Sequence, residues 1–451
     1  MFTTDFGEFF THAPGAVDVD AIREQWLAVK PPYDINQWLL PLPLWARRGY
    51  DDNGTQAWET LKSDLSQGAS QTPMCVYLHI PFCTRKCGFC DSYSFKLGAY
   101  QEEHQQQYSQ LLIDEMRLWR EQAISGSPPV PTVHLGGGTP TSLGEEHLEK
   151  IIQCTRDLFN IQADTEFALE ANVKSLTPSM IACLHRLGFR RLHIGVQSME
   201  DPVREAIGRQ CPAAEVLQTI EKTAELGWVV SVDLICGLPG QTLAGWVDGI
   251  LQLTRAGING FSLYELLIYP QNYRWAQGYG LVKRSHLPNY FLFQAGAHLL
   301  DQLGFGQNLF NHWADEQDKN IYFTFPSREE NLLALGAIAD GVFGSYHYRH
   351  PRYAGYLRQA QDGSPGLQGG LRRRPVEELA HKPTTAILSG YLSPGMLDLI
   401  TRTVKTDAAP LIQGWQQRQL IQPAEKGGMR LAANGAWFAG NMIAELVSHI
   451  S

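Results

Sequence analysis

The sequence lacks the features of a membrane or nucleic-acid-binding protein. No uninterrupted apolar stretch reaches the roughly 18 residues that a membrane-spanning helix needs. The start, MFTTDFGEFF, has no basic segment followed by an apolar core, so no secretory signal is evident. Basic residues are outnumbered, with 37 Lys and Arg against 46 Asp and Glu, and they form no run. We therefore expect no membrane and no nucleic acid among the partners of this chain.

Cysteine is also scarce, at 8 of 451 residues, and this excludes a disulfide scaffold. With 44% hydrophobic and 18% charged residues, the composition is that of an ordinary globular chain, long enough for two or three domains. Because exposed thiolates persist in a reducing compartment, we expect a cytoplasmic protein.

Three of the cysteines, Cys83, Cys87 and Cys90, are clustered with the spacing C-x3-C-x2-C. A strand-like run over 76–80 precedes them, and Pro81 ends it, which places the thiols on a loop where all can face one point. Thiolates hold iron–sulfur clusters, usually one per iron, so three leave one iron of a four-iron cluster open and reactive. The alternatives are a zinc knuckle and buried thiols. A second C-x2-C pair, typical of zinc sites, is absent from the sequence.

A glycine triplet follows in VHLGGGTP, residues 133–140. A short strand over 133–135 precedes it, and the glycines allow the backbone to approach a ligand closely. A glycine triplet alone is usually a turn. Its place one βα unit after the cysteine loop favours a binding role.

Strands and helices then alternate, which predicts βα repeats and a parallel sheet. Polar residues stand near the ends of four of these strands, namely Glu170, Gln197, Asp233 and Glu265. In a barrel of this kind the active site lies at the carboxyl ends of the strands. About six strands are visible: 76–80, 133–135, 167–173, 191–199, the strand beginning at 229, and 260–268. Helices are expected at 100–123, 145–160, 176–188, 213–227, 242–256 and 288–303.

The outer segments are less regular. Residues 38–45 form an apolar island that is either an arm packed on the main domain or a substrate lid, and we favour the arm. His347, between Tyr346 and Tyr348, is either a ligand or part of a packed strand edge, and we favour the edge. Near the end of the chain, two short strands around Gly427 and Gly428 precede a helix over 436–447.

The cysteine loop resembles a known signature. C-x3-C-x2-C with Phe89 before the last cysteine resembles that of the radical S-adenosylmethionine (radical SAM) superfamily, and Y-x-H-I-P-F-C resembles its HemN-like branch, typified by oxygen-independent coproporphyrinogen oxidase. The resemblance implies a 4Fe-4S cluster on Cys83, Cys87 and Cys90. SAM chelates the open iron and is cleaved to methionine and a 5′-deoxyadenosyl radical.

The resemblance also implies an α/β fold, a partial (β/α)6 TIM-type barrel with an N-terminal arm and a C-terminal winged-helix-like α+β domain. The expected division is an arm over 1–72, the radical SAM barrel over 73–284, an extension that closes the site over 285–375 and the C-terminal domain over 376–451.

Binding residues follow from the same resemblance, which includes two SAM molecules. The first is expected to contact Tyr77, Gly137 and Glu170. The second is expected near Phe89, Gly138, Thr139, Gln197, Arg209, Asp233 and Leu267. The polar residues suit these roles, because carboxylates accept hydrogen bonds from ribose hydroxyls or the amino group and Arg209 can clamp a carboxylate.

The sequence differs from the HemN-like pattern at two places, and these differences narrow the range of reactions that it predicts. Ser92 stands where the coproporphyrinogen oxidases carry a fourth cysteine, and REENLLAL stands where haem chaperones carry H-N-x-x-Y-W. The sequence therefore favours methyl or methylene transfer from a second SAM to an sp2 carbon of a small molecule, as in class C methyltransferases and cyclopropane-forming enzymes. Glu265 with Tyr264 is the candidate acid or base, a structural salt bridge being the alternative role of Glu265. A reducing electron donor of the flavodoxin or ferredoxin type is implied.

A second hypothesis is a protein of tetrapyrrole or haem metabolism, either coproporphyrinogen oxidase-like, haem-degrading or a haem chaperone. A third is a catalytically idle barrel, which the intact cysteine triad and glycine motif disfavour.

Overall fold

A computed structural model describes residues 6–29, 33–35, 38–46, 48–66, 72–90, 92–97, 101–359, 364–404, 409–424 and 427–450. Six parallel strands adjoin one another in chain order, which confirms the predicted α/β barrel core: β2 (Met74–Ile80), β5 (Thr132–Gly137), β6 (Glu166–Ala171), β7 (Arg191–Gln197), β8 (Val229–Cys236) and β9 (Gly260–Glu265). Most of their side chains are buried, as expected of parallel strands covered on both faces.

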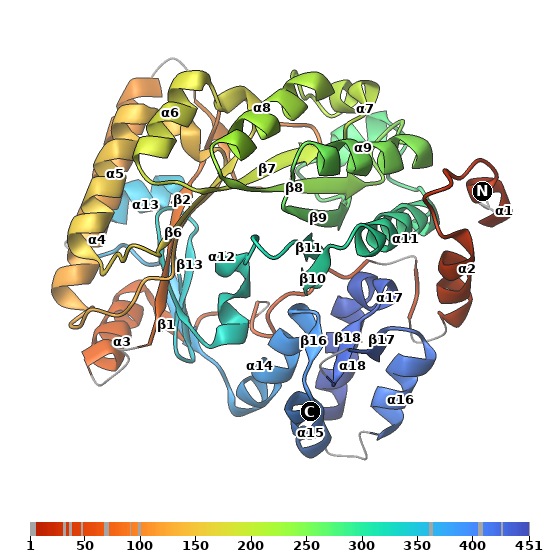
Figure 1. Cartoon of the computed structure of the whole chain (residues 1–451). Helices are drawn as coiled ribbons and strands as arrows, with labels where there is room; N and C mark the ends of the chain where they lie inside the picture. Colours follow the sequence, from red (N-terminus) through yellow and green to blue (C-terminus); the bar gives the residue numbers. More distant parts are fainter. Residues whose placement is uncertain are drawn as a thin grey trace.

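Helices cover the outer face of this sheet, and all of them except the one over residues 201–206 match predicted helices closely (Figure 1). They are α4 (Gln101–Gln122), α5 (Glu145–Leu158), α6 (Pro178–Arg186), α7 (Asp201–Ala206), α8 (Ala213–Glu225) and α9 (Leu243–Arg255). Thr177 and Thr242 cap two of them by accepting a hydrogen bond from the backbone three residues on. Within the described residues no helix is long and apolar enough to cross a bilayer.

The sheet stays open and is extended at both edges. At one edge, β12 (Asn331–Leu335) pairs parallel with β2 and continues into antiparallel β13 (Asp340–Phe343), β14 (Tyr346–Arg349), β15 (Gly369–Arg372) and β1 (Asp52–Asn53). At the other edge, β11 (His312–Ala314) and β10 (Gly306–Leu309) follow β9. The segment ENLLAL thus becomes part of the sheet itself, and His347 lies on an inner strand, not at an edge.

A short helix and the C-terminal segments occupy the concave side of the sheet. Helix α12 (Ile321–Thr324) lies inside the curve of the strands, and the C-terminal segments face it from the open side (Figure 1). Tyr322 of α12 stacks on Tyr77 and His134, with ring centroids 5.1 and 4.1 Å apart.

The N-terminal segments contact several distant parts of the chain. Helices α1 (Phe6–Phe10) and α2 (Val19–Ala28) pack around Phe291 of α11 (Leu287–Gln302). Trp38 is buried and lies 6.0 Å from Trp437, as the arm interpretation expects. Helix α3 (Gly54–Ser66) packs through Trp58 against Trp119 of α4.

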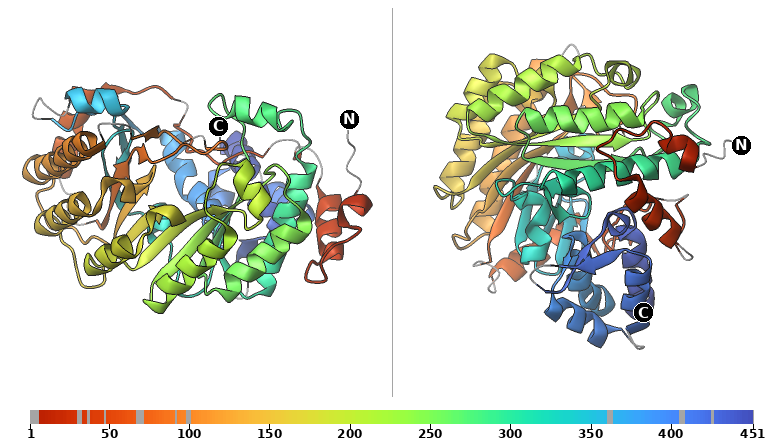
Figure 2. Two further views of the ribbon diagram at one scale, coloured as in Figure 1. Left: turned by 90° about the horizontal axis from the view of Figure 1, so that it is seen from above. Right: turned by 45° about the vertical axis from the view of Figure 1, so that its right-hand side comes forward.

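The C-terminal segments form helices around a three-stranded sheet, β16-β18-β17, that includes the predicted ribbon (Figure 2). The strands are β16 (Tyr391–Leu392), β17 (Ile421–Pro423) and β18 (Met429–Leu431), and the helices are α14 (Pro375–Leu388), α15 (Pro394–Thr403), α16 (Ala409–Gln417), α17 (Ala433–Trp437) and α18 (Ala439–Ile450).

Candidate functional site

The cysteine loop is closed by a short parallel strand pair, β3 (Phe82–Cys83) with β4 (Phe95–Lys96). Within it, Cys90 donates its backbone N–H to the carbonyl of Cys87 at 3.3 Å. The N–H of Gly88 donates to the Ile207 carbonyl at 3.2 Å, which fixes the loop to the barrel. All three cysteines are free and partly exposed, whereas the other five cysteines are buried.

The donor set fits an iron–sulfur cluster. Across the described residues, no three Cys, His, Asp or Glu side chains form a group that could hold a single metal ion. A four-iron cluster takes one thiolate per iron, so its ligands need not meet at a single ion. Such a cluster on Cys83, Cys87 and Cys90 supplies, when bound, the electron that cleaves SAM.

The residues expected at the first SAM lie together on the inner face of the sheet. The Tyr77 hydroxyl is 2.9 Å from His79 Nδ1, and the Gly137 N–H donates to Glu170 Oε2 at 3.0 Å. Glu170 Oε1 is 3.2 Å from His134 Nε2. A Cβ on Gly137, where φ is +108°, would lie 2.5 Å from the His79 ring, so glycine is required there.

The charge state of this group is set by its surroundings. Burial favours the neutral form of Glu170, but the hydrogen bond and charge of His134 outweigh it, so the pKa of Glu170 is lowered and the side chain is a carboxylate. Burial lowers the pKa of His79 to about 4, which leaves the imidazole neutral. Its Nε2 is buried and has no hydrogen-bond partner among the described residues, so this atom is available to a polar ligand.

A second group gathers four of the residues expected at the second SAM. Arg209 donates to Gln197 Oε1 at 2.5 Å, and its guanidinium lies 5.7 Å from the Phe89 ring centroid. Asn272, which the sequence analysis missed, donates to the carbonyls of both Phe89 and Leu267 at 2.8 Å. The Arg209 Nε is buried and unpartnered among the described residues, as a site for an anionic group requires.

Gly138 and Thr139 lie with the cysteine loop instead. Their N–H groups donate to the carbonyls of Ile80 and Phe82 at 2.7 Å, and the Thr139 hydroxyl is 3.7 Å from Cys83 Sγ. These contacts join the glycine motif to the cysteine loop, and none of them involves Gln197 or Arg209.

Asp233 pairs with a histidine, at 2.6 Å from His193 Nε2. Burial acts to lower the pKa of His193, but the Asp233 charge and hydrogen bond outweigh it and the pKa is raised. The charge of Glu170 also raises the pKa of His193.

Glu265, the candidate acid or base, is buried and accepts hydrogen bonds from His286 Nδ1 at 2.6 Å and Asn289 Nδ2 at 2.8 Å. The hydrogen bond to Glu265 raises the pKa of His286, as expected of the salt bridge that the sequence left as the alternative. Burial raises the pKa of Tyr264, so its hydroxyl stays protonated and does not serve as a base.

The sequence analysis missed His79, which pairs with Tyr77, and the three histidines that pair with these acidic residues, His134, His193 and His286. His79 and His134 stand inside the motifs YLHIPF and VHLGGG, where alternation along a strand places every second side chain on one face. His286 gave no local signal.

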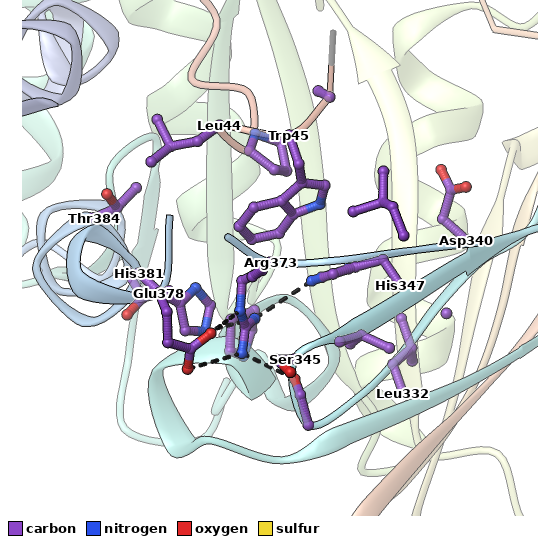
Figure 3. A pocket seen from close by; sticks show the side chains of 18 of the residues that line it. Leu44, Trp45, Leu332, Asp340, Ser345, His347, Arg373, Glu378, His381 and Thr384 are labelled. Atoms are coloured by element: carbon purple, nitrogen blue, oxygen red, sulfur yellow. Dashed lines mark hydrogen bonds and ion pairs between the residues drawn. The ribbon is translucent and has the colours of Figure 1, made fainter. Parts of the chain in front are cut away.

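A cavity of about 740 Å³ lies to one side, between β12–β15, α14 and residues 42–46, 48 and 50. His347 lines it, together with Leu44, Trp45, Arg373 and His381 (Figure 3). Burial lowers the pKa of His347 to about 3 and that of His381 to about 4. Residues 42–45 of the apolar island thus border a cavity, as a lid does, whereas Trp38 packs as an arm.

Comparison with known proteins agrees with this geometry. Residues 77–253 match the Radical SAM superfamily. The chain is 27% identical over 398 residues to an anaerobilin synthase of Escherichia coli O157:H7, covering 87% of each chain. It is 35% identical over 217 residues to the haem chaperone HemW of Bacillus subtilis, covering 47% of this chain and 55% of that one.

Among solved structures, coproporphyrinogen III oxidase (HemN) of Escherichia coli matches with a TM-score of 0.74 at 18% identity, over 91% of this chain and 99% of that one. At this identity the match establishes the fold. Residues 77–253, which include the cysteine loop, therefore form a radical SAM domain. The chain is thus similar to anaerobilin synthase, to HemW and, in its fold, to coproporphyrinogen III oxidase.

Proposed function

We propose that this protein is a radical SAM enzyme that acts on a tetrapyrrole. The observation that carries the proposal is the likeness to anaerobilin synthase over 87% of both chains. The names of all three relatives refer to tetrapyrroles or their handling. The comparisons thus favour the second hypothesis from the sequence over methyl or methylene transfer as a general activity.

The arrangement of the barrel residues supports catalysis over a binding role alone. A binding protein has no need of a carboxylate such as Glu170, held charged in a buried setting by His134 and the Gly137 N–H. We infer that Glu170, Tyr77 and Gly137 hold the SAM that is cleaved. The partners are then a tetrapyrrole and a reducing electron donor.

Methyl transfer remains the finer candidate for the chemistry, because Arg209, Gln197 and Phe89 form a second group with an unpartnered buried nitrogen. A second SAM bound there would be the methyl source. Its carboxylate would accept from Arg209, as guanidinium groups commonly bind carboxylates.

The test uses anaerobically reconstituted, reduced protein with haem and SAM that carries deuterium on its methyl group. Loss of the haem Soret band with formation of 5′-deoxyadenosine would support tetrapyrrole chemistry. Deuterium in the 5′-deoxyadenosine would place the radical on a second SAM and support methyl transfer. Formation of 5′-deoxyadenosine at a rate that haem does not change, with the haem spectrum intact, would overturn the proposal.

A further inference from the structure

Two segments that are far apart in the sequence meet around the cysteine loop, namely residues 82–97 and residues 269–286. The Asn272 side chain donates a hydrogen bond to the Phe89 carbonyl at 2.8 Å. Phe89 and Trp275 also pack against the same group of buried apolar side chains. The two segments therefore lie side by side, next to the thiols that suit a cluster.

These two segments are basic, although the chain as a whole is acidic. Each contains three Lys or Arg residues, and Asp91 is their only acidic residue, whereas the whole chain has 37 Lys and Arg against 46 Asp and Glu. All six cations are exposed, namely Arg85, Lys86, Lys96, Arg274, Lys283 and Arg284. A concentration of one sign of charge attracts a partner of the opposite sign.

The charge of these six side chains is not neutralised by the protein itself. None of them forms an ion pair with a carboxylate of the described residues. Lys86 donates instead to the Ser92 carbonyl at 2.6 Å. By contrast, exposed lysines of the outer helices are paired, such as Lys150 with Glu146 at 2.6 Å. The cations beside the cysteine loop are thus available to an acidic partner.

Exposed aromatic side chains lie among these cations. Tyr269, Tyr273 and Tyr279 are 37, 44 and 47% exposed, and the Tyr279 ring lies 5.6 Å from that of Trp275. Tyrosine is enriched in the contact surfaces of proteins, because its ring adds apolar area and its hydroxyl a hydrogen bond. Charge and aromatic area together therefore favour a protein as the partner.

The place of this surface indicates what the partner does. The three partly exposed cysteines lie within it, and Cys83 is the cross-strand partner of Lys96. Arg85 and Lys86 stand between Cys83 and Cys87 in the sequence. A protein that delivers an electron to a cluster on these thiols has to dock close to them, and the unpaired cations are there to receive it.

We propose that residues 82–97 and 269–286 form the docking surface for an acidic redox protein of the flavodoxin or ferredoxin type, which passes one electron to the cluster. The donor is oxidised by one electron and the cluster is reduced by one, so no further reactant is needed. The inference rests on the proposed function, because the electron is needed only if SAM is cleaved. A small, weak contact that opposite charges guide is typical of such encounters.

The experiment measures the binding of purified flavodoxin to full-length, reconstituted protein by surface plasmon resonance at low and at high salt. The variants are Arg274→Glu and Lys283→Glu, and Lys222→Glu, an exposed residue of α8, makes the same change of charge away from this surface. We expect salt to weaken binding, each variant to weaken it about three- to tenfold at low salt, and K222E to leave it unchanged. Tyr273→Ala is expected to weaken binding without changing its salt dependence, because it removes contact area but no charge.

Dithionite, a small chemical reductant, separates docking from SAM cleavage and from misfolding. With dithionite in place of flavodoxin, R274E and K283E are expected to form as much 5′-deoxyadenosine as the unmodified protein.

The docking surface would be overturned if both variants bound flavodoxin with the affinity and salt dependence of the unmodified protein. It would also be overturned if the unmodified protein bound neither flavodoxin nor a 2Fe–2S ferredoxin, or bound a single-stranded RNA oligonucleotide more tightly than either. If dithionite yields no 5′-deoxyadenosine from the unmodified protein, the proposed function itself fails, whereas flavodoxin binding that R274E and K283E weaken would still support the surface.

Discussion

The inner face of the sheet carries two regions of different construction. The barrel region, with Tyr77, His79, Glu170 and the cysteine loop, is built from neighbouring βα units, each of which contributes one or two polar groups near a strand end. The cavity is built from the arm, the antiparallel strands and α14, which are far apart in the sequence. We propose that the first region cleaves SAM, whereas the second is a cavity whose walls come from distant segments of the chain. On this proposal, the chemistry belongs to the part of the chain that is built from neighbouring βα units.

The largest effect is expected at the cysteine loop. Replacing Cys87 by Ser removes one of three thiolates, and since each binds a separate iron, we expect loss of nearly all cluster iron and of SAM cleavage. Iron content and the visible spectrum of anaerobically reconstituted protein provide the measurement. Cys154→Ser, a buried cysteine of α5, is the control and should retain its iron. If C87S kept the full iron content of the unmodified protein, Cys87 would not be a cluster ligand. The assignment of SAM cleavage to the barrel region would then lose its support.

The arm offers a matched pair of tryptophans. Trp38 is buried against Trp437, so Trp38→Ala should cost about 3 kcal/mol of the free energy of unfolding, as for large aromatic deletions in cores. Trp45 lines the cavity, so Trp45→Ala should cost less than about 1 kcal/mol, as at surface positions. Denaturant unfolding of the two variants is the measurement. Equal destabilisation by the two changes would show that residues 42–45 are an arm throughout.

A third change tests the barrel group. Glu170→Gln keeps the shape but removes the charge that His134 and the Gly137 N–H hold, so SAM affinity should fall about tenfold, or about 1.4 kcal/mol. Calorimetry with SAM is the measurement. Glu166→Gln, at the start of the same strand, is the control.

The smallest effect concerns pH. His79 has its pKa lowered to about 4 in the folded chain, against about 6.5 when unfolded. Between these values the unfolded chain binds a proton that the folded one does not, so stability falls as pH falls, by up to about 1.4 kcal/mol per unit. His79→Gln should flatten this part of the profile of unfolding free energy against pH, whereas His12→Gln should leave it unchanged. If H79Q showed the same change of unfolding free energy with pH as the unmodified protein, His79 would not have the lowered pKa that its burial implies.

The sequence predicted the barrel strands and the helices of its outer face because their patterns are local. Glycines that end the helices, together with periodic apolar residues, mark each βα unit within about ten to twenty residues. It also predicted that Tyr77, Gly137 and Glu170 lie together. It did not predict that Gly138 and Thr139 donate to the Ile80 and Phe82 carbonyls, because such hydrogen bonds depend on which loop packs beside the turn.

The cavity could not be predicted. In the sequence, His347 is one polar residue between two tyrosines. Its position in the cavity becomes evident only from its contacts with Trp45 and Arg373. Those contacts join segments at opposite ends of the chain. They depend on β12 pairing parallel with β2, a long-range pairing with no local signal.

The most direct test of the division between the two regions is the yield of 5′-deoxyadenosine from SAM in reduced, reconstituted protein, compared between the unmodified chain, Glu170→Gln and His347→Ala. The account predicts that H347A, with its cluster and SAM affinity intact, gives the yield of the unmodified protein, whereas E170Q gives much less at the same SAM concentration. Equal yields in E170Q and in the unmodified protein would contradict the account, since SAM cleavage would then not depend on the barrel region.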